Sequence, residues 1–201
     1  VTAFLKTPEY EKILSFHPGV IVQTRIEADR PLMKGSAIHL QKTVMNLIFN
    51  AAEAQPAGGV IRIFTCNRHL DEPVGEYDRV HAGDYLVLSV EDEGEGIAPE
   101  DLKRIFEPFF TKKVMGRSGT GLGMAVVWGT VKDHGGFIDI QSKSGEGTRF
   151  HLYLPVTLKS HQPKSQPLPM AAYMGRGETV LVVDDVAEQR EIAGQILSAL
   201  G

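Results

Sequence analysis

Hydrophobic residues recur at spacings of three and four between Ser36 and Pro56, which predicts a helix with one buried face. Ser36 has the right side chain to cap that helix, and Pro56 ends it. Its buried stripe consists of Leu40, Val44, Leu47, Ile48 and Ala51. The same kind of reading predicts further helices over residues 7–16, 99–106 and 121–134.

Short blocks of alternating or continuous apolar residues predict β-strands over residues 19–28, 60–65, 85–90, 137–142 and 148–154. Residues 67–84 are polar and too numerous for a tight turn, so we expect an exposed loop there. Three main helices and about five strands with hairpin connections predict the α+β class, as a two-layer α/β sandwich.

The composition changes after this predicted domain, which we place at residues 1–156. Residues 157–177 carry three prolines among Lys, Gln and Ser, which indicates a linker. Residues 178–185 then predict a buried strand that ends in Asp184 and Asp185, with a helix over residues 187–200. Residues 178–201 therefore look like the start of a second domain.

The chain has 201 residues, 42% of them hydrophobic, and a net charge of −4, which is ordinary globular composition. This slightly acidic balance argues against a nucleic-acid partner. The single cysteine, Cys66, excludes an internal disulfide. No apolar run is long enough to span a membrane, and no leader opens the chain. Val1 and Gly201 stand at abrupt ends, so we expect a piece of a longer protein.

Asn46 and Asn50 are four residues apart on one predicted helix, so their side chains share a face. An amide oxygen is a suitable neutral ligand for Mg²⁺. The alternative is that both are polar residues on a solvated face.

The sequence Asp92-x-Gly94-x-Gly96 follows an apolar strand. A carboxylate at a strand end can accept a hydrogen bond from the exocyclic amine of adenine, and glycines let backbone approach a flat base. The alternative is an ordinary turn.

The sequence Gly119-x-Gly121-x-Gly123 leads into a predicted helix, where free N–H groups and the helix dipole favour phosphate. It is neither a dinucleotide fingerprint nor a Walker P-loop. The preceding residues 106–118 predict a mobile lid whose cations reach phosphates, or else a solvated surface loop. The cations are Lys112, Lys113 and Arg117.

In this order the motifs resemble the ATP-binding catalytic domain of sensor histidine kinases, in the superfamily of DNA gyrase, the ninety-kilodalton heat-shock chaperone and MutL. The resemblance covers roughly residues 4–156 and also includes FEPFF at 106–110 and GEGT at 145–148. It implies a Bergerat-type fold, with a mixed, mainly antiparallel sheet, three main helices on one face and a mobile ATP lid.

The resemblance also implies roles for single residues. Asn50 becomes the Mg²⁺ ligand, Asp92 the adenine reader, and Thr148 a neighbour of the adenine. Lys112, Lys113 and Arg117 neutralise the phosphates, and Asn46 joins them as a catalytic candidate. The remaining ATP-binding candidates are Gly94, Gly96, Ile97, Phe106, Gly119, Thr120, Gly121, Leu122 and Gly123.

Asn46 favours a kinase over an ATPase, because hydrolytic relatives place a glutamate there as general base and an amide cannot take a proton. The expected reaction is transfer of the γ-phosphoryl of ATP to a histidine on a dimerisation domain outside this chain. Glu53 departs from many kinases, which carry Lys or Arg nearby. An ATPase and a non-catalytic nucleotide sensor remain the alternatives.

Residues 178–201 resemble the first strand and helix of a response-regulator receiver domain, which makes Asp184 and Asp185 a Mg²⁺ pair in an intact receiver only. None of the seven histidines stands in a phospho-acceptor motif. The resemblance thus implies ATP and Mg²⁺ as cofactors, and a dimerisation or histidine-phosphotransfer domain and a receiver domain as partners. It further implies a cytoplasmic, monomeric piece without nucleic-acid or direct membrane contact.

Overall fold

The computed structural model describes residues 1–29, 33–112, 120–157 and 174–200. The chain divides into two compact units, Val1–Leu158 and Lys159–Gly201. Each unit is described by itself.

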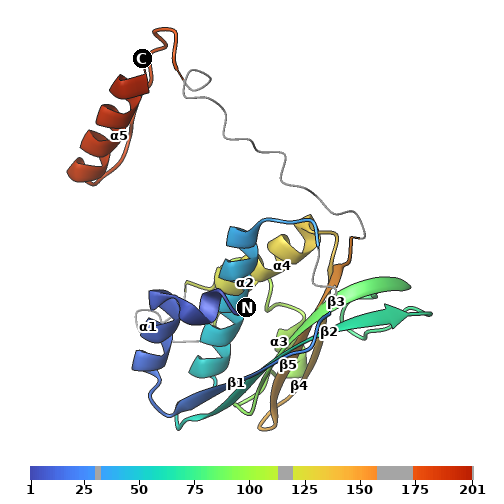
Figure 1. Cartoon of the computed structure of the whole chain (residues 1–201). Helices are drawn as coiled ribbons and strands as arrows, with labels where there is room; N and C mark the ends of the chain where they lie inside the picture. The colour runs from blue at the N-terminus through green and yellow to red at the C-terminus, as the bar shows by residue number, and fades with distance from the viewer. Residues whose placement is uncertain (30–32, 113–119, 158–173, 201) are drawn as a thin grey trace. The chain divides into compact units, whose positions relative to one another are not determined.

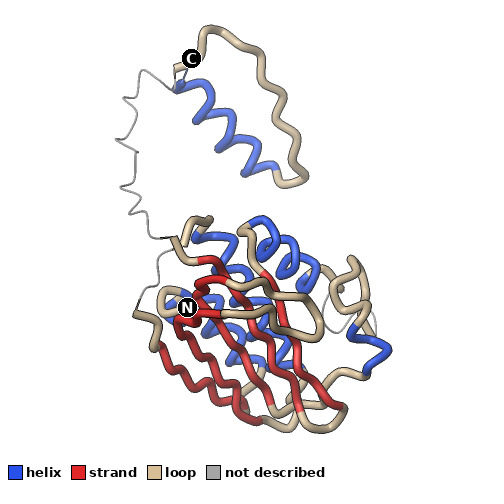
Figure 2. The backbone as a smooth tube through the Cα atoms, turned by 90° about the vertical axis from the view of Figure 1, so that its right-hand side faces the viewer, coloured by secondary structure: helices blue, strands red, loops and turns tan. Residues whose placement is uncertain are grey.

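The first unit is built on a five-stranded sheet with the order β1-β2-β3-β5-β4 (Figures 1 and 2). β1 pairs with β2 in parallel, and every other pairing is antiparallel. The predicted mixed, mainly antiparallel sheet is therefore confirmed. The strands are β1 (Val20–Ile26), β2 (Gly59–Leu70), β3 (Gly83–Asp92), β4 (Phe137–Lys143) and β5 (Gly147–Pro155).

The helices of this unit cover one face of the sheet, as predicted (Figure 2). The Ser36 side chain accepts a hydrogen bond from the His39 N–H and so caps the long helix α2. Helix α4 begins at Gly123 and not at Gly121, because Gly121 has a φ of +68° that a helix cannot contain. The helical elements are η1 (Phe4–Lys6), α1 (Pro8–Phe16), α2 (Ala37–Glu53), α3 (Pro99–Leu102) and α4 (Gly123–Asp133).

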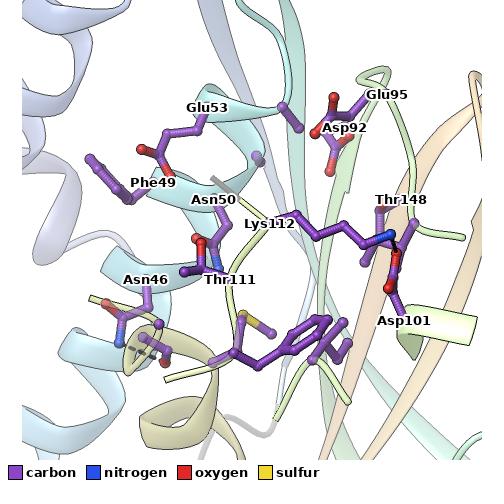
Figure 3. A pocket seen from close by; sticks show the side chains of 18 of the residues that line it. Asn46, Phe49, Asn50, Glu53, Asp92, Glu95, Asp101, Thr111, Lys112 and Thr148 are labelled. Carbon is purple, nitrogen blue, oxygen red and sulfur yellow. Dashed lines mark hydrogen bonds and ion pairs between the residues drawn. The ribbon is translucent and has the colours of Figure 1, made fainter. Parts of the chain in front are cut away.

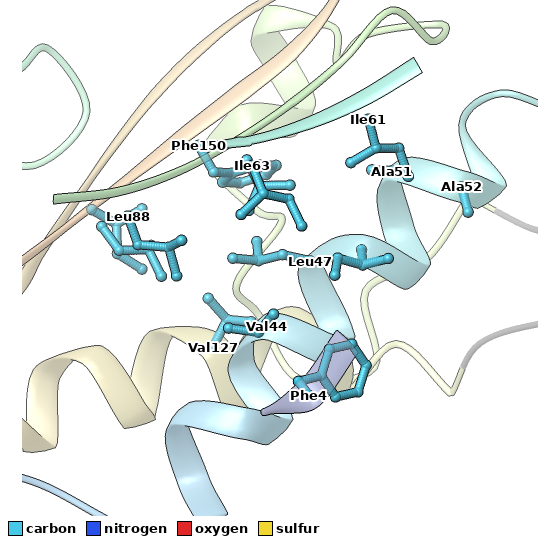
Figure 4. Close-up of a cluster of buried hydrophobic side chains, with 14 of the residues drawn as sticks. Phe4, Val44, Leu47, Ala51, Ala52, Ile61, Ile63, Leu88, Val127 and Phe150 are labelled. Carbon is cyan, nitrogen blue, oxygen red and sulfur yellow. The ribbon is translucent and has the colours of Figure 1, made fainter. Parts of the chain in front are cut away.

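The core lies between the helices and the sheet (Figure 4). The buried stripe of α2 faces Ile61 and Ile63 of β2, while Val127 of α4 completes the layer. Leu47 and Ile48 are at most 1% exposed, which confirms the predicted buried face of α2.

Residues 71–82, here called the strap, link β2 to β3. The expectation of an exposed loop over residues 67–84 is wrong in part. The strands extend further than predicted, and Val80 of the strap is fully buried. Val80 is buried because the strap packs on a second, smaller apolar cluster, on the sheet face opposite the helices. Its buried members are Leu70, Val80, Tyr85, Val87 and Tyr153.

In the second unit, helix α5 (Ala187–Leu200) has the predicted bounds. The strand predicted over residues 178–185 is not formed, and Leu181 and Val183 are 86% and 82% exposed. A strand needs a neighbour for its backbone groups, and residues 174–200 provide none. Across the described ranges of both units, no helix combines the length and apolar character that crossing a membrane requires.

Candidate functional site

A cavity of about 350 Å³ opens between α2, the end of β3 and the start of α4 (Figure 3). Its outer side is formed by residues 105–112, here called the wall segment. The cavity collects side chains from parts of the chain that are far apart in sequence. Of the predicted site residues it is lined by Asn46, Asn50, Asp92, Gly96, Ile97, Lys112, Thr120, Gly121, Gly123 and Thr148.

Asp92 lines the cavity and is only 6% exposed. Its Oδ1 accepts a hydrogen bond of 2.9 Å from the Gly94 N–H. Burial raises the pKa of Asp92 to about 6, although backbone N–H groups of Gly94 and Thr148 oppose the rise. The Asp92 carboxyl is therefore a buried acceptor that titrates near neutral pH.

Gly94 and Gly96 are needed for close packing of backbone against backbone. A Cβ on Gly94 would lie 2.5 Å from the carbonyl oxygen of Ala54, at the end of α2. One on Gly96, whose φ is +68°, would lie 2.1 Å from the carbonyl oxygen of Lys143. Gly96 lines the cavity and Gly94 does not. The glycines thus bring the Asp92 turn against α2 and the β4–β5 turn.

Thr148 stands opposite Asp92 in the pairing of β3 with β5. Its hydroxyl lies 2.9 Å from the Ser142 hydroxyl. Ser142 also accepts a hydrogen bond of 2.8 Å from the Ile97 N–H. This network fixes the Thr148 and Ile97 sides of the cavity.

The two asparagines of α2 have different surroundings. The Asn46 side-chain N–H donates to the carbonyl oxygen of Gly123 over 3.1 Å, which ties α2 to the first residue of α4. Asn50, one turn later, lines the cavity nearer to Asp92 (Figure 3).

The glycine motif before α4 is held by the wall segment. The Phe109 N–H donates to the Gly121 carbonyl over 3.0 Å, and a Cβ on Gly121 would lie 2.5 Å from the Phe109 backbone. Within the part of the chain that the structure describes, no side chain caps the N-terminus of α4 at Leu122, so its first N–H groups can meet an anion. Leu122 itself does not line the cavity. Gly119, Lys113 and Arg117 lie outside the described residues.

Two predicted site residues have other partners. The Lys112 ammonium forms an ion pair with Asp101 and points toward that carboxylate (Figure 3). Phe106 does not line the cavity. Its ring packs against Trp128, with the two centroids 5.0 Å apart. The FEPFF motif alone does not indicate that the Phe106 ring points toward Trp128 and away from the cavity.

Several lining residues were not predicted. Phe49 and Glu53 lie three residues after Asn46 and Asn50, so helical spacing could have found them. The others are neighbours of predicted residues on the same segment, such as Ala51 and Ala54 on α2, or come from segments that meet only in the fold. They are Ala51, Ala54, Glu95, Ala98, Asp101, Ile105, Phe110, Thr111, Met124 and Phe150.

The sequence matches known proteins over most of its length. Residues 35–158 match the family model described as histidine kinase-, DNA gyrase B-, and HSP90-like ATPase. The sensor kinase CckA of Brucella abortus is 36% identical over an alignment of 177 positions that covers 83% of this chain and 19% of CckA. The sensor histidine kinase ZraS of Escherichia coli O157:H7 is 35% identical over 71% of this chain and 28% of its own length.

Solved structures of two sensor histidine kinases share this fold. The mycobacterial sensor histidine kinase MprB superposes with a TM-score of 0.57 at 25% identity, over 77% of this chain and 93% of the MprB chain. The catalytic domain of histidine kinase ThkA, at 24% identity and a TM-score of 0.56, shares the fold; the match covers 78% of this chain and 93% of that domain. The chain spans less than a third of the curated relatives CckA and ZraS. This chain belongs to the family of histidine kinase-, DNA gyrase B- and HSP90-like ATPases, and its first unit is an ATP-binding catalytic domain of the sensor histidine kinase type.

Proposed function

We propose that the cavity binds Mg²⁺-ATP with its adenine at Asp92 and its phosphates between Asn50 and the start of α4. The buried Asp92 carboxyl carries this proposal. It lies buried at one end of the cavity, where the exocyclic amine of adenine can donate to it. Thr148 and Ile97 border the same end. The uncapped N-terminus of α4 at the other end suits a polyanion.

The donor set of the cavity fits Mg²⁺. Asn50 offers a neutral amide oxygen, and Glu53 one turn later lines the same cavity. Mg²⁺ commonly takes one or two protein oxygens and completes its shell with phosphates and water. We assign Asn50 as the protein ligand. Bound there, Mg²⁺ supplies charge neutralisation for the transferred phosphoryl group.

The reaction we propose is transfer of the γ-phosphoryl group to a histidine on a separate dimerisation domain. Asn46 supports transfer over hydrolysis, because its side chain is an amide whose N–H is engaged with Gly123. Such a group cannot take a proton from water. Catalysis then depends on positioning and on charge neutralisation by cations, with Lys112 exchanging Asp101 for phosphate.

The second unit supports a further assignment. We propose that residues 178–201 begin a receiver domain, with Asp184 and Asp185 as its acidic Mg²⁺ pair once the domain is complete. The exposed apolar residues Leu181 and Val183 fit a strand that acquires its neighbours only there. We place the catalytic domain in the cytoplasm, where its partners and ATP are found.

One assay tests the proposed function. The protein is mixed with Mg²⁺-ATP, with and without the dimerisation domain of its parent kinase, and acid-labile phosphohistidine and free phosphate are followed together. We expect phosphohistidine only when that domain is present, and little free phosphate. Steady phosphate release without the added domain would establish an ATPase instead. Nucleotide binding without either product would establish a nucleotide sensor.

A further inference from the structure

The strap joins the far face of the sheet to the wall segment of the cavity. On the far face, the fully buried Val80 anchors the strap. The His81 ring meets the Phe137 ring edge-on, with the two centroids 5.3 Å apart. On the helix side, Tyr77 packs against the main core. The strap therefore touches both layers at the start of edge strand β4.

Two aspartates fix the strap against this edge. The buried Asp139 of β4 accepts hydrogen bonds from the N–H groups of Glu76, at 3.0 Å, and Tyr77, at 3.3 Å. Asp78 accepts a hydrogen bond of 3.1 Å from the Ile138 N–H and forms an ion pair with Lys132 of α4. Tyr77 is thus held from both sides.

The Tyr77 ring meets the wall segment directly. Its centroid lies 5.5 Å from that of Phe106 and 6.3 Å from that of Trp128, both edge-on. Phe106, Tyr77 and Trp128 therefore form a triangle of rings in mutual contact, in which Phe106 packs against both of the others. The residues around Phe106, namely Ile105, Phe110, Thr111 and Lys112, line the cavity.

We propose that Tyr77 is a positioning residue for nucleotide binding, because it fixes Phe106 and with it the wall segment that carries Thr111 and Lys112. The inference rests on the proposed function. It assigns the strap a role in phosphate binding. The sequence does not suggest this role, because the strap belongs to none of the motifs that contain Asp92 and Asn50. The proposed adenine end is formed mainly by Asp92, Thr148 and Ile97, whereas the ring contacts of Tyr77 lead to Phe106 and Trp128. The effect therefore falls on the triphosphate part of the ligand.

The test compares Mg²⁺-ATP with adenosine by calorimetry. We expect Tyr77→Ala to weaken Mg²⁺-ATP binding about three- to tenfold, the scale of one lost aromatic pair, and to change adenosine affinity less than about twofold. Tyr77→Phe keeps the ring and should restore both affinities. Tyr77→Leu keeps apolar bulk and serves if the alanine variant unfolds, with the same selective loss expected. Far-ultraviolet circular dichroism reports whether each variant is folded, since Trp128 emission would respond to the loss of the Tyr77 ring itself.

The matched control is His81→Ala, which removes an edge-on ring contact from the same strap on the far face. We expect its affinity for both ligands to stay within about twofold of wild type. Equal losses for ATP and adenosine in Tyr77→Ala, or the same change in His81→Ala, would overturn the inference by showing a general structural role. Wild-type protein that bound neither ligand would instead overturn the proposed function, and the inference with it.

Discussion

The Asn46 side chain donates a hydrogen bond to the Gly123 carbonyl, which lies 77 residues later in the chain. Helix α2 carries the proposed Mg²⁺ ligand Asn50, and Gly123 begins the helix whose N-terminus borders the proposed phosphate site. This one bond therefore sets the spacing between the metal ligand and the phosphate-binding helix. The bond gives Asn46 a structural contact beside the catalytic role that the resemblance implies for it.

Replacing Asn46 should reveal this donor role. We expect Asn46→Ala to lower the free energy of unfolding by about 1 kcal/mol, the usual net value of one hydrogen bond. Asn46→Asp should cost more, because a carboxylate cannot donate and would face the Gly123 carbonyl oxygen. Urea unfolding at neutral pH measures both variants. An aspartate variant as stable as wild type would show that the bond contributes nothing.

The raised pKa of Asp92 predicts that adenosine affinity depends on pH. Only the ionised carboxylate accepts from the exocyclic amine without competition from its own proton. With a pKa of about 6, raised mainly by burial and slightly by Glu91 and Glu95, most of the carboxyl is protonated at low pH. We expect binding to weaken about tenfold between pH 7.5 and pH 5. Calorimetry with adenosine measures it, since that ligand carries no phosphate to titrate.

Asp92→Asn provides the control for this pH dependence. An amide still accepts through its oxygen but does not titrate, so we expect weaker binding that stays constant across the same range. A wild-type affinity that was equally flat would contradict the assignment of adenine to Asp92.

The same carboxyl should make the domain less stable as the pH rises. Because the folded pKa of about 6 lies above the ordinary value of 3.8, the unfolded chain loses its proton first. The stability contribution is therefore present below pH 3.8 and is lost as the pH rises through 6. We expect Asp92→Asn to raise the free energy of unfolding by about 1–3 kcal/mol at pH 7.5. Urea unfolding at pH 4 should show almost no difference between the two proteins, and a gain there as large as at pH 7.5 would exclude ionisation as its cause.

Local motifs predicted one part of the site and tertiary packing decided the rest. Asp92 and Asn50 could be placed from the sequence, because a strand end and a helical spacing fix where such side chains emerge. The direction of Phe106 depends on Trp128 and Tyr77, which lie in other segments. The partner of Lys112 is Asp101 of the short helix α3, and no periodicity encodes a contact between that helix and the wall segment.

The fold shows the same division. Bounds of α2 and α5 followed from caps and apolar spacing. The burial of Val80 could not be predicted from local spacing, because the strap packs on a cluster whose other residues come from β2, β3 and β5. The strand expected over residues 178–185 had the right composition but no partner strand among the described residues. A β-strand forms only where a second strand pairs with it, so the sequence of one segment cannot by itself guarantee that the segment becomes a strand.

Two glycines of the domain should respond oppositely to alanine. Gly94 packs on the end of α2, where a Cβ would lie 2.5 Å from the Ala54 carbonyl oxygen and 2.7 Å from the Ala54 Cβ. Relieving these overlaps requires the Asp92 turn to move, so we expect Gly94→Ala to lower the free energy of unfolding by about 1–3 kcal/mol and to weaken adenosine binding.

Gly129 lies within α4, and nothing stands within 4 Å of its added Cβ. There alanine removes only the helix penalty of glycine, so Gly129→Ala should stabilise by about 0.5–1 kcal/mol. Urea unfolding measures the stability of both variants, and calorimetry with adenosine measures their affinity. A Gly94→Ala variant that kept wild-type stability and affinity would show that the α2 contact does not position Asp92.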